Sequence, residues 1–233
     1  MGDRLLSCRR NEVKTINVLI ACEESQEVCK AFRERGHMAF SCDIQECSGG
    51  HPEWHIKGDC LPLLNGNCEF TTLDGKTHKQ GGLWDLLIAF PPCTYLTNAS
   101  AVRMRVKGVI QPERYAKAME AREFFMAFYN ANCPHIAIEN PTPMKIVQLP
   151  PYSCVVQPYE HGHPYSKRTC LWLKGLPPLM PTDILSYHEP YVNGGCKDAH
   201  GNYRRFQGRN ERDAKTRAKT FPGIARAMAE QWG

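Results

Sequence analysis

One stretch constrains the fold of this chain more than any other: an apolar run from Trp84 to Phe90 that two prolines end. A continuous apolar run of this kind is typical of a strand buried on both faces of a parallel sheet. Pro91 and Pro92 stop the strand because proline has no N–H to give to a neighbour and its φ is fixed. Cys93 follows directly. Chemistry in open α/β sheets lies beyond the carboxyl ends of the strands, so Cys93 stands where a nucleophile is expected.

Cysteine is common in this chain, so position rather than residue type distinguishes Cys93. The 233 residues include 12 cysteines, and a free cysteine usually behaves as a small buried apolar residue. No Cys-x-x-Cys pair occurs, whereas zinc sites usually show close ligand pairs. His161 and His163 have no third evident ligand. We therefore expect reduced thiols, a reducing cytoplasm and no structural metal.

The composition is that of an ordinary globular protein. Hydrophobic residues make up 42% and charged residues 23% of the chain, and the length fits one domain with a sheet covered on both faces. The net charge of +5 is compatible with a polyanionic partner without being diagnostic of one. No apolar run approaches the ~18 residues of a membrane span. Residues 1–11 lack the apolar core of a signal peptide, so we expect neither secretion nor a membrane segment.

Apolar runs and helical patterns alternate along the chain as in an α/β fold. Strands are predicted over 16–21, 38–42, 56–60, 84–90, 135–138, 154–157 and 169–173, helices over 28–35, about 112–129 and from Phe221 onward, and a hairpin within 65–82. The first strand, turn, helix and second strand, which Asp43 ends, have the layout of a nucleoside-binding half. The prediction is a Rossmann-like fold, with a mostly parallel, twisted sheet and helices on both faces.

We expect a single domain over residues 1–233, with a core over about 16–176 and a closing helix within 214–233. The segment between them, 177–213, has no strong periodicity. The sequence does not decide whether the protein is a monomer or a homodimer. Basic side chains gather in this segment and in the loop that follows Cys93, namely Arg103, Arg105, Lys107, Arg204 and Arg205. Such residues can contact nucleic-acid phosphates, and they also occur on ordinary solvated surfaces.

Three motifs follow one another in a recognisable order: a Pro-Pro-Cys ending at Cys93, a strand that leads to Glu139, and a basic pair ending at Arg168 that opens a strand. With this order the chain resembles the DNA cytosine-5 methyltransferase family, and in particular its short members in bacteriophages and prophages. The likeness covers residues 16–173, with a weaker similarity over 219–225. It implies an S-adenosylmethionine-dependent methyltransferase fold, DNA as partner, and the cytoplasm of a bacterial or phage-infected host cell.

The resemblance also implies a role for each matching residue. Cys93 would add to carbon 6 of cytosine as a nucleophile. Glu139 would hold N3 and the exocyclic amine of the base, and Arg168 would stabilise the carbonyl oxygen electrostatically. Asp43 stands where the family has its ribose-binding acid. The residues that the resemblance places around S-adenosylmethionine are Ala21, Cys22, Glu23, Asp43, Ile44, Asp59, Cys60 and Pro91.

The chain departs from the family at three places. The first turn, residues 22–26, lacks the family's glycines, which let a backbone approach a ligand closely, and carries two carboxylates that can bind an ammonium or sulfonium. Pro164 and Ser166 replace two of the three residues of the basic motif. The recognition region is reduced to about 177–213. RNA or a free nucleotide therefore stays open as substrate, as does a non-catalytic module that binds nucleic acid or protein. Phe90 before the prolines and a cysteine after them favour carbon-5 over amino-group methylation.

Overall fold

The structure is a computed structural model that describes residues 14–192, 194–197, 200, 203–206 and 214–233; side chains are described for 14–192, 200 and 216–233. The strands are β1 (Asn17–Ala21), β2 (Met38–Asp43), β3 (His55–Lys57), β4 (Cys68–Thr71), β5 (Thr77–Gln80), β6 (Leu86–Ala89), β7 (Arg105–Val106), β8 (Val109–Ile110), β9 (Ile136–Asn140), β10 (Cys154–Val156), β11 (Tyr165–Ser166), β12 (Thr169–Lys174), β13 (Glu189–Pro190), β14 (Gly194–Lys197) and β15 (Tyr203–Phe206). The helices are α1 (Glu27–Glu34), α2 (Ala101–Met104), α3 (Pro112–Tyr129), α4 (Ala214–Ala218) and α5 (Pro222–Trp232), and five short 3-10 turns are η1 (Pro52–Trp54), η2 (Leu61–Leu63), η3 (Asn98–Ser100), η4 (Lys145–Val147) and η5 (Pro158–Glu160).

A seven-stranded sheet forms the centre of the molecule, in the order β10-β12-β9-β6-β1-β2-β3. The pairs that join β9, β6, β1, β2 and β3 are parallel. Strand β12 runs antiparallel to both β9 and β10 and so reverses the direction at one edge. From β1 the strands follow one another outward to β3 at one edge, and from β6 they continue through β9 and β12 to β10 at the other edge. The strand order therefore reverses between β1 and β6, which is the topological switch point of the sheet.

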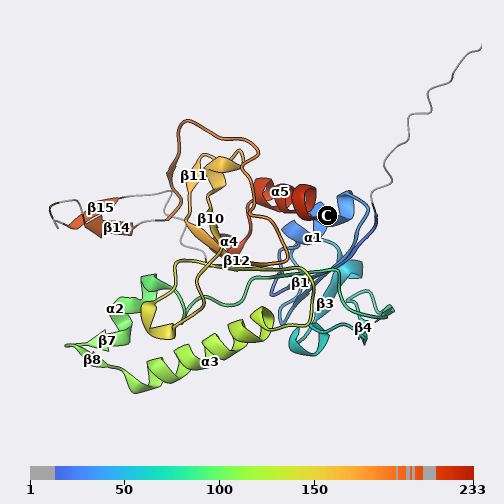
Figure 1. Ribbon diagram of the computed structural model, residues 1–233, viewed down its shortest axis with the longest axis horizontal. Coiled ribbons are helices and arrows are strands. Elements are labelled where there is room, and N and C mark those ends of the chain that lie inside the picture. The colour runs from blue at the N-terminus through green and yellow to red at the C-terminus, as the bar shows by residue number, and fades with distance from the viewer. Residues whose placement is uncertain (1–13, 193, 198–199, 201–202, 207–213) are drawn as a thin grey trace, which may run out of the picture.

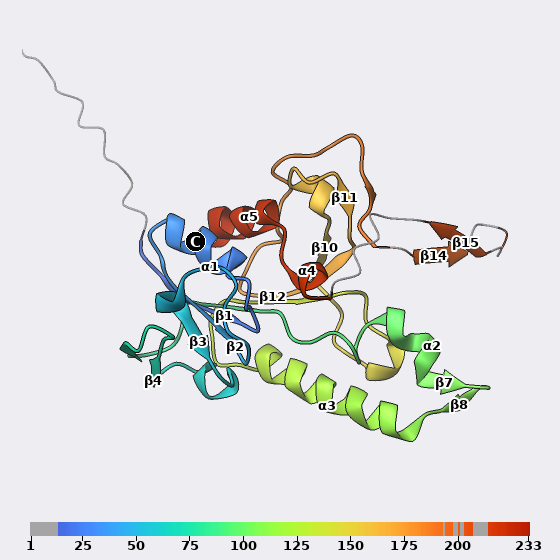
Figure 2. The same ribbon diagram turned by 180° about the vertical axis from the view of Figure 1, so that it is seen from behind.

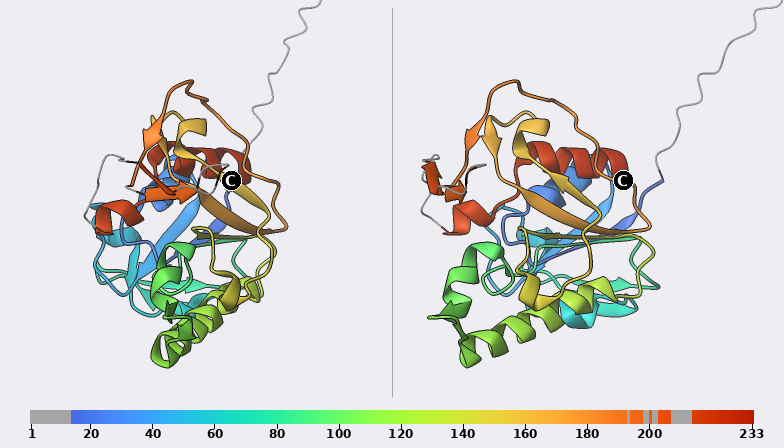
Figure 3. Two further views of the ribbon diagram at one scale, coloured as in Figure 1. Left: turned by 90° about the vertical axis from the view of Figure 1, so that its left-hand side faces the viewer. Right: turned by 60° about the vertical axis from the view of Figure 1, so that its left-hand side comes forward.

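Helices cover both faces of this sheet, as Figures 1 and 2 show, with α1 and α5 on one face and α3 on the other. The strands alternate accordingly. In β1, Val18 and Ile20 pack in the cluster that includes α1 and α5 residues, whereas Leu19 and Ala21 pack in the cluster that includes α3 residues. Helix α5, at the end of the chain, lies alongside α1 in both views of Figure 3. A mixed α/β fold with a mostly parallel sheet is thus confirmed.

Small hairpins lie outside the central sheet. Strands β4 and β5 form the hairpin expected within 65–82. The pair β7–β8, in the passage expected as a loop, and the pair β14–β15, in the segment without strong periodicity, project from one side of the molecule (Figure 1). Among the described residues, no helix combines the length and apolar character that a membrane crossing requires. The division into core, recognition segment and closing helix stays a prediction.

Candidate active site

Three neighbouring strands end at the switch point and lead into the predicted site. Strand β1 leads into residues 22–26, which we call the first turn, and β6 leads into residues 91–97, which we call the second turn. Strand β9 lies on the other side of β6, with Glu139 near its end. Because parallel strands end at the same edge of a sheet, residues far apart in sequence come together there.

Hydrogen bonds hold the second turn in place behind its two prolines. The carbonyl oxygen of Cys93 accepts the N–H groups of Leu96 and Thr97, both at 3.0 Å. The N–H of Asn98 donates to the carbonyl of Thr142 at 2.8 Å, which ties the end of the turn to the segment after β9. The side chain of Cys93 stays half-buried. A thiol on a fixed turn at the open edge of a sheet is placed as a nucleophile requires.

The Glu139 carboxylate acts electrostatically on Cys93. Burial raises the pKa of the Cys93 thiol, and the nearby Glu139 carboxylate raises this pKa further, while the charges of Lys167 and Arg217 lower it. Burial also raises the pKa of the half-buried Glu139, and Lys167 opposes this shift. A carboxyl with a raised pKa holds its proton more readily and can donate a hydrogen bond. The structure therefore brings together two of the three residues predicted to be catalytic.

The third residue, Arg168, lies elsewhere. Its exposed guanidinium donates to the hydroxyl of Tyr152 at 3.1 Å, and its charge is 5.9 Å from that ring. Lys167, its neighbour, lines a cavity together with Glu139 and Thr169. Adjacent residues in an extended segment point to opposite faces, so only one of the two cations can face Glu139. The catalytic role of Arg168 stays a prediction, but the cation beside Glu139 is Lys167.

The first turn uses one of its own carboxylates to complete helix α1. Glu23 is only 4% exposed, and its two carboxylate oxygens accept the N–H groups of Val28 at 2.6 Å and Cys29 at 3.2 Å. These N–H groups belong to the first helical turn and have no partner within the helix. Burial raises the pKa of Glu23 to about 8, and the two N–H groups partly offset the shift.

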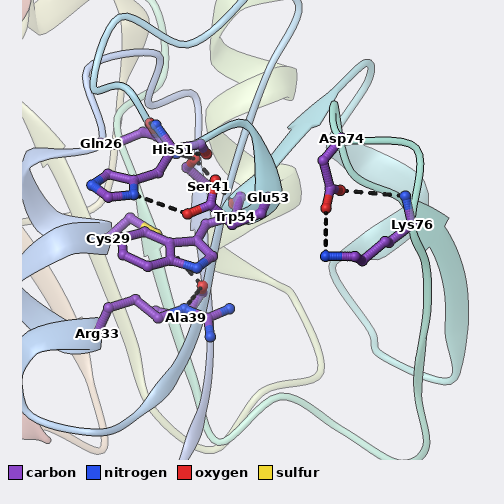
Figure 4. Close-up of polar contacts among 10 residues, drawn as sticks. All are labelled: Gln26, Cys29, Arg33, Ala39, Ser41, His51, Glu53, Trp54, Asp74 and Lys76. Atoms are coloured by element: carbon purple, nitrogen blue, oxygen red, sulfur yellow. Dashed lines mark hydrogen bonds and ion pairs between the residues drawn. The ribbon is translucent and has the colours of Figure 1, made fainter.

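The loop before β3 supports the first turn from outside, as Figure 4 shows. The side-chain amide of Gln26 donates to the carbonyl of His51 at 2.9 Å and accepts the His51 N–H at 3.1 Å. Gln26 also has a left-handed backbone with φ of 58°. Gly49 packs against it so closely that an added Cβ would lie 2.5 Å from the Cβ of Gln26. The first turn contains no glycine, but the loop that packs against it requires one at position 49.

Two cavities adjoin each other at this edge. One contains Glu139 and Lys167, and we call it the Glu139 cavity; the other contains Glu23 and Glu24, and we call it the Glu23 cavity. Both are lined by Phe90 and by the segment 218–220, which precedes α5. Phe90 and this segment were not predicted as site residues. The signals available were the position of Phe90 before the prolines and the weak similarity over 219–225.

The other predicted cofactor residues lie around the ends of β1, β2, β3 and β6. Asp43, at the end of β2, accepts the Gln45 N–H at 2.8 Å, and Ile44 beside it is 77% exposed. Asp59, exposed, accepts the Leu61 N–H at 3.0 Å. Further members of this set are buried or paired: Ala21 and Pro91 are buried, and the sulfur atoms of Cys22 and Cys60 are 3.9 Å apart. Among the described residues, no three His, Cys, Asp or Glu side chains are placed to hold a metal ion.

The predicted nucleic-acid residues lie in the two hairpin regions. Arg103, Arg105 and Lys107 are exposed on α2 and the β7–β8 hairpin, which follow the second turn after η3. Arg204 and Arg205 belong to β15, which pairs with β14, and their side chains are outside the described part of the structure. Both hairpins project from the same side of the molecule (Figure 2).

Comparison with known proteins adds little to this geometry. No protein-family model matches the chain, and no curated protein sequence matches it. Among solved structures, a methyltransferase of Entamoeba histolytica matches with a TM-score of 0.36 and 14% identity, over 78% of this chain and 59% of that one. The chain thus spans less than two thirds of that protein, and a likeness at this level carries no argument about function.

Proposed function

We propose that this protein transfers a methyl group from S-adenosylmethionine to carbon 5 of cytosine in DNA, through a covalent bond between Cys93 and the base. The observation that carries the proposal is the position of Cys93 after β6 and of Glu139 near the end of the adjacent strand β9, where the Glu139 carboxylate raises the pKa of the Cys93 thiol. The motif resemblance gives this pair its assignment to cytosine. RNA and free cytosine nucleotides are the alternative substrates.

In this reaction Cys93 acts as nucleophile and then as leaving group. The thiol gives its proton to solvent, and the thiolate forms a bond to carbon 6, which makes carbon 5 electron-rich. After carbon 5 has been methylated, it loses its proton to a base, the carbon–sulfur bond breaks, and the ring double bond returns. Glu139, in its protonated form, donates to N3 and stabilises the ring while it carries negative charge. A base in duplex DNA must be flipped out first, and the basic β7–β8 hairpin is suited to contact the phosphates.

The residues around the Glu23 cavity fit the proposed cofactor. S-adenosylmethionine, when bound, supplies the methyl group from a positively charged sulfonium. The cavity is lined by Glu23, Glu24 and Lys219, a set of acidic and basic groups that complements a zwitterionic amino-acid group next to a cation. Asp43 would hold the ribose hydroxyls, and the exposed Ile44 would cover part of the adenine. Phe90 lines both this cavity and the Glu139 cavity.

The test is transfer of labelled methyl from S-adenosylmethionine to duplex DNA, with RNA and cytidine triphosphate in parallel. Wild type, Cys93→Ser and Cys154→Ser are compared, since Cys154 is also half-buried but lies in β10. We expect label in 5-methylcytosine for wild type and Cys154→Ser, and none for Cys93→Ser. Label that survives Cys93→Ser would contradict the covalent mechanism. Label only in RNA or nucleotide would replace DNA as substrate, and no transfer by wild type would favour a binding role.

A further inference from the structure

Two neighbouring cations lie at the start of β12, and the sheet separates them. The register pairs Leu171 with Glu139. Leu171 packs in the cluster that includes α5, whereas Cys170 and Trp172 pack in the cluster that includes α3. Two-residue alternation therefore puts Lys167 on the Glu139 face and Arg168 on the opposite face. The contacts agree, because Arg168 reaches Tyr152, whose ring packs against that of Trp172 at 5.9 Å.

Lys167 is held at its place by three contacts. Its backbone N–H donates to the side-chain oxygen of Gln157 at 2.9 Å. Its ammonium donates to the carbonyl of Arg217 at 2.7 Å and lies 5.9 Å from the centre of the Phe221 ring. An ammonium carries three N–H donors, and the Arg217 carbonyl takes one of them. The charge is thereby fixed beside the Glu139 cavity.

We propose that Lys167 is the positioning cation of the active site, placed on the Glu139 face where it favours the thiolate of Cys93, and that Arg168, on the opposite face, has no part in this. The effect on Cys93 concerns the protein alone. Its use in catalysis rests on the proposed function, because the thiolate that Lys167 favours is the species that would attack carbon 6. The charged groups that shift the pKa of Cys93 are Glu139 on β9, Lys167 before β12 and Arg217 on α4. Lys219 lines the same cavity as Glu139.

The test measures the rate at which iodoacetamide alkylates Cys93 as a function of pH, in the full chain. Mass spectrometry of the peptide that contains Cys93 separates this thiol from the others, and Cys93→Ser gives the blank. In Lys167→Met we expect the apparent pKa of Cys93 to rise, with alkylation at pH 8 slowed about tenfold, as befits loss of one nearby opposite charge. Arg168→Met, the matched control, should leave the profile in place. Lys167→Arg keeps the charge and should restore most of the rate.

Loss of the contacts with Arg217 and Phe221 has a different signature from loss of charge. A loosened segment would expose Cys93 and change its alkylation at every pH, with no shift of the profile. Such a result, an unshifted profile in Lys167→Met, or an equal shift in Arg168→Met would each overturn the proposal. Alkylation needs neither DNA nor cofactor. A shifted profile in a protein that transfers no methyl group would therefore refute the proposed function and leave the placement of Lys167 intact.

Discussion

The first and second turns leave neighbouring strands at the same sheet edge but use their reactive side chains differently. In the first turn, the carboxylate of Glu23 is buried and bonded to the N–H groups of α1. In the second turn, backbone groups satisfy one another, and the thiol of Cys93 stays half-exposed. A side chain whose polar atoms satisfy backbone groups of its own turn and helix contributes to stability. Where backbone groups already satisfy one another, the side chain is available for chemistry.

The largest effect is expected when Glu139, the β9 residue that acts on Cys93 of the second turn, is replaced by glutamine. Glutamine keeps the shape but can neither hold nor release the proton, so methyl transfer should fall about 10²-fold. Alkylation of Cys93 should instead become faster, because removal of the Glu139 charge lowers the pKa of the thiol. Parallel assays of methyl transfer and alkylation check this. Two rates that fall together would indicate damage to the fold rather than loss of a catalytic group.

The two turns should also differ in stability when each loses its reactive side chain. Glu23→Ala leaves two helix N–H groups without their acceptor and should lower the free energy of unfolding by about 2 kcal/mol. Cys93→Ala removes a half-buried thiol and should change it by no more than about 0.5 kcal/mol. Urea denaturation of both variants measures these values. Equal losses would show that the second turn depends on its side chain as much as the first does.

The elements that build this comparison were predictable where the signal is local. The apolar run that ends at two prolines predicted β6 and its turn, and the acid after the second apolar run predicted the end of β2 at Asp43. These signals lie within a few residues of what they determine. The sequence therefore located the end of β6 and the candidate nucleophile that follows it.

Other features depend on partners far away in the sequence. Whether Lys167 or Arg168 faces Glu139 depends on the register of β12 against β9, and a shift by one residue would exchange them. The role of Glu23 depends on the left-handed backbone of Gln26, which His51 and Gly49 support from another loop. No pattern within residues 22–26 indicates the left-handed backbone of Gln26 or the role of Glu23. The hairpin β7–β8 has two residues in each strand, too few for an alternation to be visible.

A third prediction concerns the ligand charge that the first turn prefers, and it rests on the proposed function. Two acidic side chains line the Glu23 cavity. Above the Glu23 pKa of about 8, S-adenosylmethionine, with its sulfonium, should therefore bind about tenfold more tightly than S-adenosylhomocysteine, whose sulfur is uncharged, a difference of about 1.4 kcal/mol. Isothermal titration calorimetry with both ligands gives the ratio. Glu139→Gln should keep the ratio, because Glu139 lines the other cavity. Equal affinities would show that the acidic side chains of the first turn do not bind the sulfonium in place of the family's glycine turn.

A further effect expected of the first turn is a pH dependence of stability. Folding raises the pKa of Glu23 from its ordinary value of 4.5 to about 8, so the folded protein keeps a proton that the unfolded chain releases. The contribution of Glu23 to stability is then fully present below pH 4.5 and is lost as the pH rises through about 8. The slope it adds is bounded by one proton, which is about 1.4 kcal/mol per pH unit.

Glu23→Gln isolates this slope, because glutamine fills the same space without titrating. Urea denaturation between pH 5 and 9 should show wild-type stability falling with pH relative to Glu23→Gln, and Glu139→Gln keeps Glu23 and should retain the wild-type fall from this residue. The ionisation of Glu23 should also affect ligand binding. Above pH 8 Glu23 is charged, so its attraction for a cationic ligand is greatest there. A fixed difference between wild type and Glu23→Gln at every pH would mean that the helix N–H groups keep Glu23 ionised throughout. The first turn would then be a permanent anion, and its preference for a cationic ligand would not change with pH.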